Sequence, residues 1–267
     1  MMGIVENRAP DAVANGLEKL LSVQRPLVLA YVRAVRRRHP DSSPAEIVKI
    51  LERQYLAAVT TGGAAVGASA VIPGVGVGVS LALSGVETAG FLETSALFAQ
   101  SVTEVHGIAV EDPERARTLV MAMIMGTAGA DLVKQASGGG PRNRFWGEMI
   151  TKNLPKAAMN QVADRIKKTF IRKFVASQGT TIIGRAIPFG VGAVIGGVGN
   201  NILGRKVISS SRDAFGPTPM SFPLVLEPRA EGDPPEPHTK GPRRWRKIGS
   251  RRDEPIWTDE LRPPPPA

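Results

Sequence analysis

The chain has 267 residues, of which 42% are hydrophobic, 22% charged and 5% aromatic, and its formal net charge is +10. This length predicts one or two domains, and the scarcity of aromatic residues predicts a core of Ala, Val, Leu, Ile and Gly. Cysteine is absent, which excludes disulfides, thiolate nucleophiles and cysteine-ligated metals. Because His39, His106 and His238 lie far apart in the sequence, no pair has metal-ligand spacing, and we expect no metal or cofactor.

The first expected element is an amphipathic helix over residues 11–39, in which apolar residues recur at helical spacing. Pro26 is expected to bend this helix and Pro40 to end it, because proline lacks the N–H group that a helix interior needs. The N-terminus has no basic start followed by an apolar run, as a secretory signal would have, so we expect a cytoplasmic protein. Residues 1–43 form the first predicted region.

A strong helix start opens the second predicted region, residues 44–215. Ser43 can cap the helix, Pro44 suits the first helical position, and Glu46 completes a capping box. Further helices are expected over residues 79–106, from 113 toward 138, over 145–175 with a division at Pro155, and after Pro188 to about residue 215. Because no stretch shows a credible strand pattern, we predict an all-α fold, a helical bundle with glycine-rich packed central helices.

The composition changes abruptly after Gly216. Residues 217–266 hold thirteen of the 22 prolines, and their apolar content is too low to offset the entropy cost of ordering them. We therefore predict a Pro-rich disordered tail over residues 216–267. Trp245 and Trp257 could serve there as short binding elements for a protein partner, with solubilising low-complexity sequence as the alternative.

Two segments, residues 56–86 and 186–204, contain no charged residue and are rich in glycine. Pro73 and the glycines after it divide the first segment into halves shorter than the roughly 20 residues that a membrane-spanning helix needs. Small residues spaced by four let another helix approach closely, and the predicted packing positions are Gly63, Gly67, Gly192, Gly196, Asn200 and Gly204. We interpret the segments as buried core helices, with peripheral or re-entrant membrane contact and a transmembrane topology as alternatives.

Residues 160–175 combine an apolar helical face with flanking cations. Those cations are Arg165, Lys167, Lys168, Arg172 and Lys173. A helix of this kind suits contact with an anionic lipid surface. Nucleic-acid binding is not expected, because stacking aromatics are scarce here. The alternative is the solvated face of an ordinary amphipathic helix.

No motif in the sequence predicts a catalytic site. Neither glycine segment contains Gly-Lys-Ser/Thr, and the glycines at 74–78 lack the preceding strand and the third glycine of a dinucleotide fingerprint. A Gly-x-Ser-x-Gly elbow is also absent. Glu87, Glu93 and Asp131 are the acids that a hydrolytic pocket could use, but Glu87 and Glu93 share a helical face poorly at six residues apart. We expect a non-enzymatic protein without catalytic residues.

Three stretches together resemble the EcsC protein family, over roughly residues 44–215. They are AVIPG at 70–74 leading into a helix with Glu87, VHGI at 105–108 followed by DPE at 112–114, and AIPFGVGAVIG at 186–196 with Asn200 and the AF pair at 214–215. The resemblance implies a bacterial helical protein of unassigned molecular function. The family's name, taken from a gene beside an ABC transporter, hints at a membrane-proximal role. The Pro-rich tail and His106 depart from the family pattern, and no catalytic residue can be carried over.

Two functional hypotheses follow, beside that of an enzyme that would use Glu87, Glu93 or Asp131 in a buried pocket. In the first, the chain works at the inner membrane surface as a peripheral, non-enzymatic protein that contacts anionic lipid or a membrane protein complex. In the second, it is a helical interaction module that recruits a protein partner through the tail.

Overall fold

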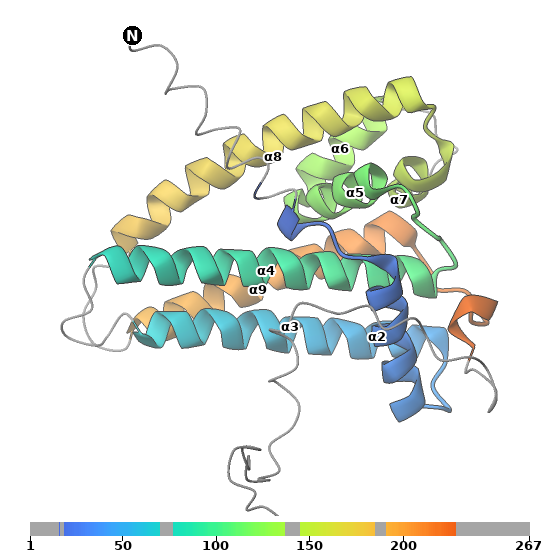
Figure 1. Cartoon of the computed structure of the whole chain (residues 1–267), viewed down its shortest axis with the longest axis horizontal. Helices are drawn as coiled ribbons and strands as arrows, with labels where there is room; N and C mark the ends of the chain where they lie inside the picture. The colour runs from blue at the N-terminus through green and yellow to red at the C-terminus, as the bar shows by residue number, and fades with distance from the viewer. Residues whose placement is uncertain (1–15, 17–18, 70–76, 137–144, 185–190, 228–267) are drawn as a thin grey trace, which may run out of the picture. The chain divides into compact units, whose positions relative to one another are not determined.

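The computed structural model describes residues 16, 19–69, 77–136, 145–184 and 191–227. Side-chain surroundings are described within these ranges except at residues 64–69, 77–86, 152–153, 173–184 and 191–196. The chain divides into two units, Met1–Glu231 and Gly232–Ala267, and every described residue belongs to the first. The described residues form helices and no strand, which confirms the predicted all-α class (Figure 1). The predicted tail beyond residue 227 lies outside the described residues.

The first described helix is α2, Arg25–Arg38. Residues 22–24 are not helical, so the prediction of one helix bent at Pro26 is wrong. Pro26 instead stands in the first turn of α2, where its missing N–H group would have had no helical partner in any case. Val28, Val32 and Val35 are fully buried, and α2 packs on α4. The boundary predicted at residue 43 therefore does not separate α2 from the helices that follow.

Helix α3, Pro44–Ser69, begins with the predicted capping box. The Ser43 backbone N–H donates to Glu46 Oε2 at 2.7 Å, and the Ser43 hydroxyl donates to the same oxygen at 2.9 Å. The Glu46 backbone N–H donates to Ser43 Oγ at 3.4 Å, which completes the reciprocal pair of the capping box. The backbone hydrogen bond from Ser43, followed by that of its hydroxyl, holds the pKa of Glu46 below its usual value of 4.5.

This cap predicts a pH-dependent effect of Glu46→Gln. A carboxyl whose pKa is lowered by folding contributes stability above its unfolded pKa and loses it as the pH falls through the folded pKa. We expect urea unfolding to show the wild type more stable than Glu46→Gln at about pH 7, with the difference shrinking below about pH 4.5. A difference that stays constant down to about pH 3 would contradict this assignment.

Helix α4, Val77–Val105, ends where Gly107 takes a φ of 70°, so the predicted glycine stop is confirmed. Asp112 then caps α5, Pro113–Met125, by accepting a hydrogen bond from the Glu114 N–H at 2.8 Å. The prediction of one helix from 113 toward 138 is wrong. Gly126, with a φ of 64°, separates α5 from α6, Thr127–Ala136, because glycine adopts this left-handed backbone at no steric cost.

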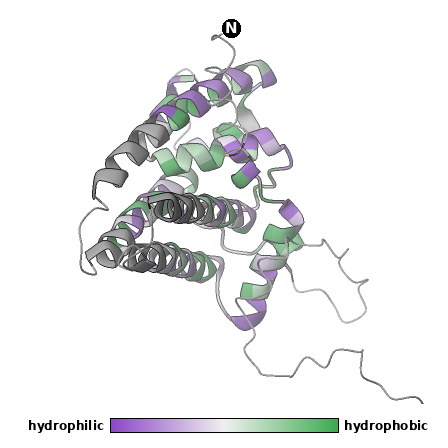
Figure 2. Ribbon diagram, turned by 60° about the vertical axis from the view of Figure 1, so that its left-hand side comes forward, coloured by the Kyte–Doolittle hydropathy of each residue, from purple (hydrophilic) through white to green (hydrophobic). Residues whose placement is uncertain are grey.

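The next segments are α7, Trp146–Glu148, a π-helical turn at Met149–Asn153, and α8, Lys156–Gly184. The break before α8 confirms the predicted division at Pro155. Helix α9, Val191–Phe215, ends at Gly216, whose φ is 69°. Hydrophilic and hydrophobic residues alternate along the coloured part of α8, as expected of an amphipathic helix (Figure 2).

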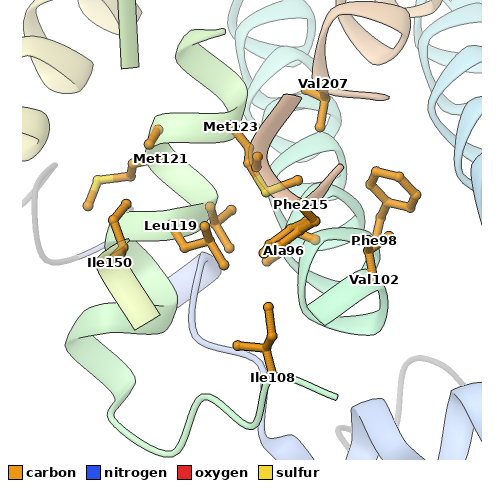
Figure 3. Close-up of a cluster of buried hydrophobic side chains, with 14 of the residues drawn as sticks. Ala96, Phe98, Val102, Ile108, Leu119, Met121, Met123, Ile150, Val207 and Phe215 are labelled. Atoms are coloured by element: carbon orange, nitrogen blue, oxygen red, sulfur yellow. The ribbon is translucent and has the colours of Figure 1, made fainter. Parts of the chain in front are cut away.

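The core forms where α3, α4 and α9 pack on one another and α5 covers α4 and α9. Phe98, Val102, Leu119, Met123 and Phe215 all lie in this buried cluster (Figure 3). Tyr55 of α3 stacks on Phe98 of α4 with ring centroids 4.6 Å apart, and its hydroxyl lies 2.9 Å from Ser95 Oγ. Burial raises the pKa of this Tyr55 hydroxyl.

The segment after α9, residues 216–227, packs against α2 and includes η2, Leu224–Leu226. Arg33 donates to the Val225 carbonyl and Arg36 to the Leu226 carbonyl. Leu226 itself is buried. This corrects the predicted tail boundary at residue 216, because arginines of α2, far away in the sequence, supply partners for the backbone carbonyls of this segment.

Candidate membrane-facing surface

The uncharged stretches of three packed helices lie at one end of the first unit. Helices α3 and α9 run antiparallel, since Glu52 meets Arg212 while Thr60 meets Asn201. Helix α4 begins at the end where α3 finishes (Figure 1). Residues 56–69 of α3, 77–86 of α4 and 191–204 of α9 contain no charge. We call these three stretches the uncharged end. Helix α8, uncharged over 174–184, finishes on the same side.

Within the uncharged end, α9 lies directly against α3. A Cβ atom at Gly204 would lie 3.0 Å from both Leu56 Cδ1 and Val59 Cγ2, so the absence of a side chain permits this approach. Asn200 donates to the Val59 carbonyl at 3.2 Å and to Glu87 Oε1 at 3.1 Å. The Asn200 amide thereby ties α3, α4 and α9 together.

The structure thus places two of the predicted packing residues, Asn200 and Gly204, at the α3–α9 contact. Gly63 is buried in α3. Gly67 lies in α3, and Gly192 and Gly196 in α9, but their surroundings fall outside the described residues. Gly62 of α3 and Gly199 of α9 are not packed in this way, because nothing lies within 4 Å of a Cβ atom built at either position.

The described parts of α3 and α9 expose uncharged, mostly apolar side chains. On α9, Val198 is 52% exposed, Ile202 50% and Leu203 46%. On α3, Ala57 and Thr61 are exposed. These residues form an exposed uncharged surface that a partner of this end of the unit would contact.

Exposed cations stand where the uncharged stretches stop. Arg53 precedes the stretch of α3, and Arg205 and Lys206 follow that of α9. Arg172 of α8 is also exposed, close to the start of its uncharged residues. At 1.5 Å per residue, these cations lie about 18–24 Å along their helices from the helix ends. We call Arg53, Arg172, Arg205 and Lys206 the basic border.

Only part of the predicted cationic face of α8 belongs to this border. Arg172 does, whereas Arg165 and Lys168 are exposed one to two turns further from the uncharged end. Lys167 is partly buried, and the side chain of Lys173 is outside the described residues. Sequence reasoning missed Arg53, Arg205 and Lys206, although each stands among the first charges beside an uncharged run.

The candidate catalytic acids lie on two different helices, α4 and α6. Glu87 is engaged by Asn200 at 3.1 Å. Glu93 lies on α4, and Asp131 is an exposed residue of α6. No group of three or more His, Asp or Glu residues in the described ranges could hold a metal ion.

Within the part of the chain that the structure describes, no helix has the length and apolar character needed to cross a bilayer. Comparison with protein-family models, with curated proteins and with solved structures finds no match to this chain. The resemblance to the EcsC family therefore stays a prediction.

Proposed function

We propose that this chain is a peripheral membrane protein that inserts its uncharged end into one leaflet and holds anionic headgroups with its basic border. One observation carries the proposal: uncharged stretches from helices far apart in the sequence gather at one end, and exposed cations stand where they stop. Apolar groups at the depth of acyl chains, with Lys and Arg at headgroup level, are the pattern of interfacial membrane contact.

The length of the uncharged stretches favours insertion into one leaflet. Each uncharged stretch of α3, α4 and α9 is roughly 15–21 Å long at 1.5 Å per residue. The hydrocarbon core of a bilayer is about 30 Å thick, so one leaflet contributes about 15 Å. The stretches therefore suit one leaflet and fall short of both.

The expected free energy of membrane binding favours reversible association. Completing the burial of a half-exposed Val, Ile or Leu side chain is worth about 1 kcal/mol. Each cation beside an anionic surface adds about 1 kcal/mol. Val198, Ile202 and Leu203 together with the four border cations thus supply several kcal/mol, before the cost of immobilising the protein is subtracted. This is the range of salt-sensitive peripheral association.

The family resemblance supports the same proposal. An EcsC-like chain with a membrane-proximal role would need a surface that meets the bilayer without crossing it. The uncharged end and its basic border could supply such a surface.

The absence of cysteine allows a direct test with single labels. Ile202→Cys places an environment-sensitive fluorophore on the uncharged end. Met220→Cys places one on a residue that is 98% exposed, beyond the opposite end of α9. With vesicles of phosphatidylcholine and phosphatidylserine, we expect a blue shift and quenching by brominated acyl chains at position 202 only.

Removing border charges tests the headgroup contact separately. We expect Arg53→Gln or Lys206→Gln to weaken vesicle binding about fivefold, the equivalent of about 1 kcal/mol. Lys156→Gln, which removes an exposed cation at the start of α8, is the matched control. If the full chain stays in solution with both anionic and neutral vesicles, the proposal fails and the interaction-module hypothesis is favoured.

A further inference from the structure

A cleft of about 290 Å³ lies where α3, α4 and α9 meet the segment that follows α9. Apolar side chains, Val48 and Val102 among them, form part of its wall. The polar lining residues are Lys49, Glu52, His106, Ser211, Arg212 and Thr218. Cations, hydroxyls and an imidazole from four segments therefore converge on one small space.

Glu52 and Arg212 form the best-defined contact of this lining. Arg212 Nε donates to Glu52 Oε1 at 2.8 Å, and Arg212 Nη2 donates to Oε2 at 2.6 Å. The hydrogen bond to Glu52 raises the pKa of Arg212. A guanidinium carries five N–H donors, and this contact uses two of them. Arg212 thus keeps donors for another acceptor, while the buried carboxylate of Glu52 is already paired.

The charges in the cleft favour an anion. Lys49 and Arg212 bring two positive charges against the single carboxylate of Glu52. The hydroxyl groups of Ser211 and Thr218 add donors that an oxyanion can use.

The His106 ring also lines the cleft. Its Nδ1 lies 2.9 Å from the Val102 carbonyl, so Nδ1 carries the proton and Nε2 is the acceptor of the neutral ring. Nε2 is buried and has no hydrogen-bond partner among the described residues. An oxyanion such as phosphate matches the cationic and hydroxyl donors that line the cleft.

The cleft lies about one to two helical turns from the basic border along α3 and α9. Lys49 stands four residues before Arg53 on α3, and Arg212 stands seven residues after Arg205 on α9, so each pair shares a helix face. A phosphate group could therefore arrive from solution or as the headgroup of a lipid held at the border.

We infer that this cleft binds a phosphate-type oxyanion between Lys49 and Arg212. The site itself does not rest on the proposed membrane function; only the lipid source of the phosphate does.

Histidine ring signals in an NMR spectrum of the full chain test the site, because the chain has only three histidines. With inorganic phosphate as the probe, we expect a saturable shift of the His106 signal and none with sodium chloride at equal ionic strength. Lys49→Met should weaken phosphate binding about tenfold, as expected for loss of a charge-assisted hydrogen bond. Lys156→Met, which removes an exposed lysine outside the cleft lining, should leave phosphate binding unchanged.

Three results would overturn the inference. The His106 signal could fail to move with phosphate, the His39, His106 and His238 signals could move together, or Lys49→Met and Lys156→Met could weaken binding equally. The last two would indicate general ion association.

Vesicles of phosphatidylcholine with phosphatidic acid then identify the source of the phosphate. If free phosphate displaces the chain from these vesicles, the cleft takes a lipid headgroup. If it does not, while the His106 shift persists, the ligand is a free phosphate compound. Failure to bind any vesicle would remove the proposed membrane function and leave the phosphate site standing.

Discussion

Replacing Gly204 by leucine is expected to lower the free energy of unfolding by about 3 kcal/mol, the upper range for overpacking a tight contact. The first added atom would already lie 3.0 Å from both Leu56 Cδ1 and Val59 Cγ2 and 3.6 Å from Tyr55 Cε1. The remaining side-chain atoms have no room unless α9 moves away from α3. Such a movement would also break the hydrogen bond from Asn200 to the Val59 carbonyl. Urea denaturation followed by circular dichroism measures the loss.

Gly199→Ala is the matched control in the same helix. Nothing lies within 4 Å of a Cβ atom built there, so the substitution removes the helical penalty of glycine and should stabilise the chain by up to about 1 kcal/mol. The free energy of unfolding of Gly204→Ala should lie between those of Gly204→Leu and Gly199→Ala, because the alanine Cβ would contact only the ends of side chains that can shift. If the leucine variant at position 204 were as stable as Gly199→Ala, the close α3–α9 contact would be wrong.

Arg25→Met is expected to cost about 3 kcal/mol, because it leaves a buried carboxylate without its partner. Glu104 is 3% exposed on α4, and Arg25 reaches it from the first turn of α2. Arg25 Nε donates to Glu104 Oε1 at 2.6 Å and Nη2 donates to Oε2 at 3.2 Å. The Glu104 hydrogen bond raises the pKa of Arg25. The estimate is at the low end for buried pairs because the Arg25 side chain is 29% exposed.

A double substitution isolates the interaction between Arg25 and Glu104 from the other effects of each single substitution. Arg25→Met combined with Glu104→Gln removes the unpaired charge, so it should recover part of the loss of Arg25→Met alone. Thermal unfolding of the two single variants and the double variant completes the cycle. Strict additivity would mean that the two side chains do not interact.

These two substitutions probe different parts of the first unit. The Gly204 contact lies within the uncharged end, whereas the Arg25–Glu104 pair lies near the other end of α4. We therefore expect Gly204→Leu to reduce vesicle binding by disturbing the proposed membrane surface. Arg25→Met should leave binding intact under conditions where the chain remains folded.

Local chemistry in the sequence was enough to predict several helix limits. The capping box at Ser43, the glycine stop at Gly107 and the division at Pro155 each depend on groups within a few residues of one another. A capping side chain that accepts from a neighbouring backbone N–H has the same local effect in many folds. The same holds for proline, which lacks the backbone N–H. The all-α class follows from such local signals together with helical periodicity.

Tertiary contacts, which local sequence signals cannot predict, determine which segments are ordered and which residues share a surface. Residues 216–227 have the composition of a disordered tail, yet Arg33 and Arg36 of α2 supply partners for their carbonyls. Sequence alone suggested that Gly204 belonged to a packing stripe, but only the fold distinguishes it from Gly199, whose Cβ position is open. The basic border likewise depends on distant segments, because antiparallel packing brings Arg53 and Arg205 to a similar depth. Sequence determines which residues are charged, small or helical, and the packing of distant helices determines which of them share a surface.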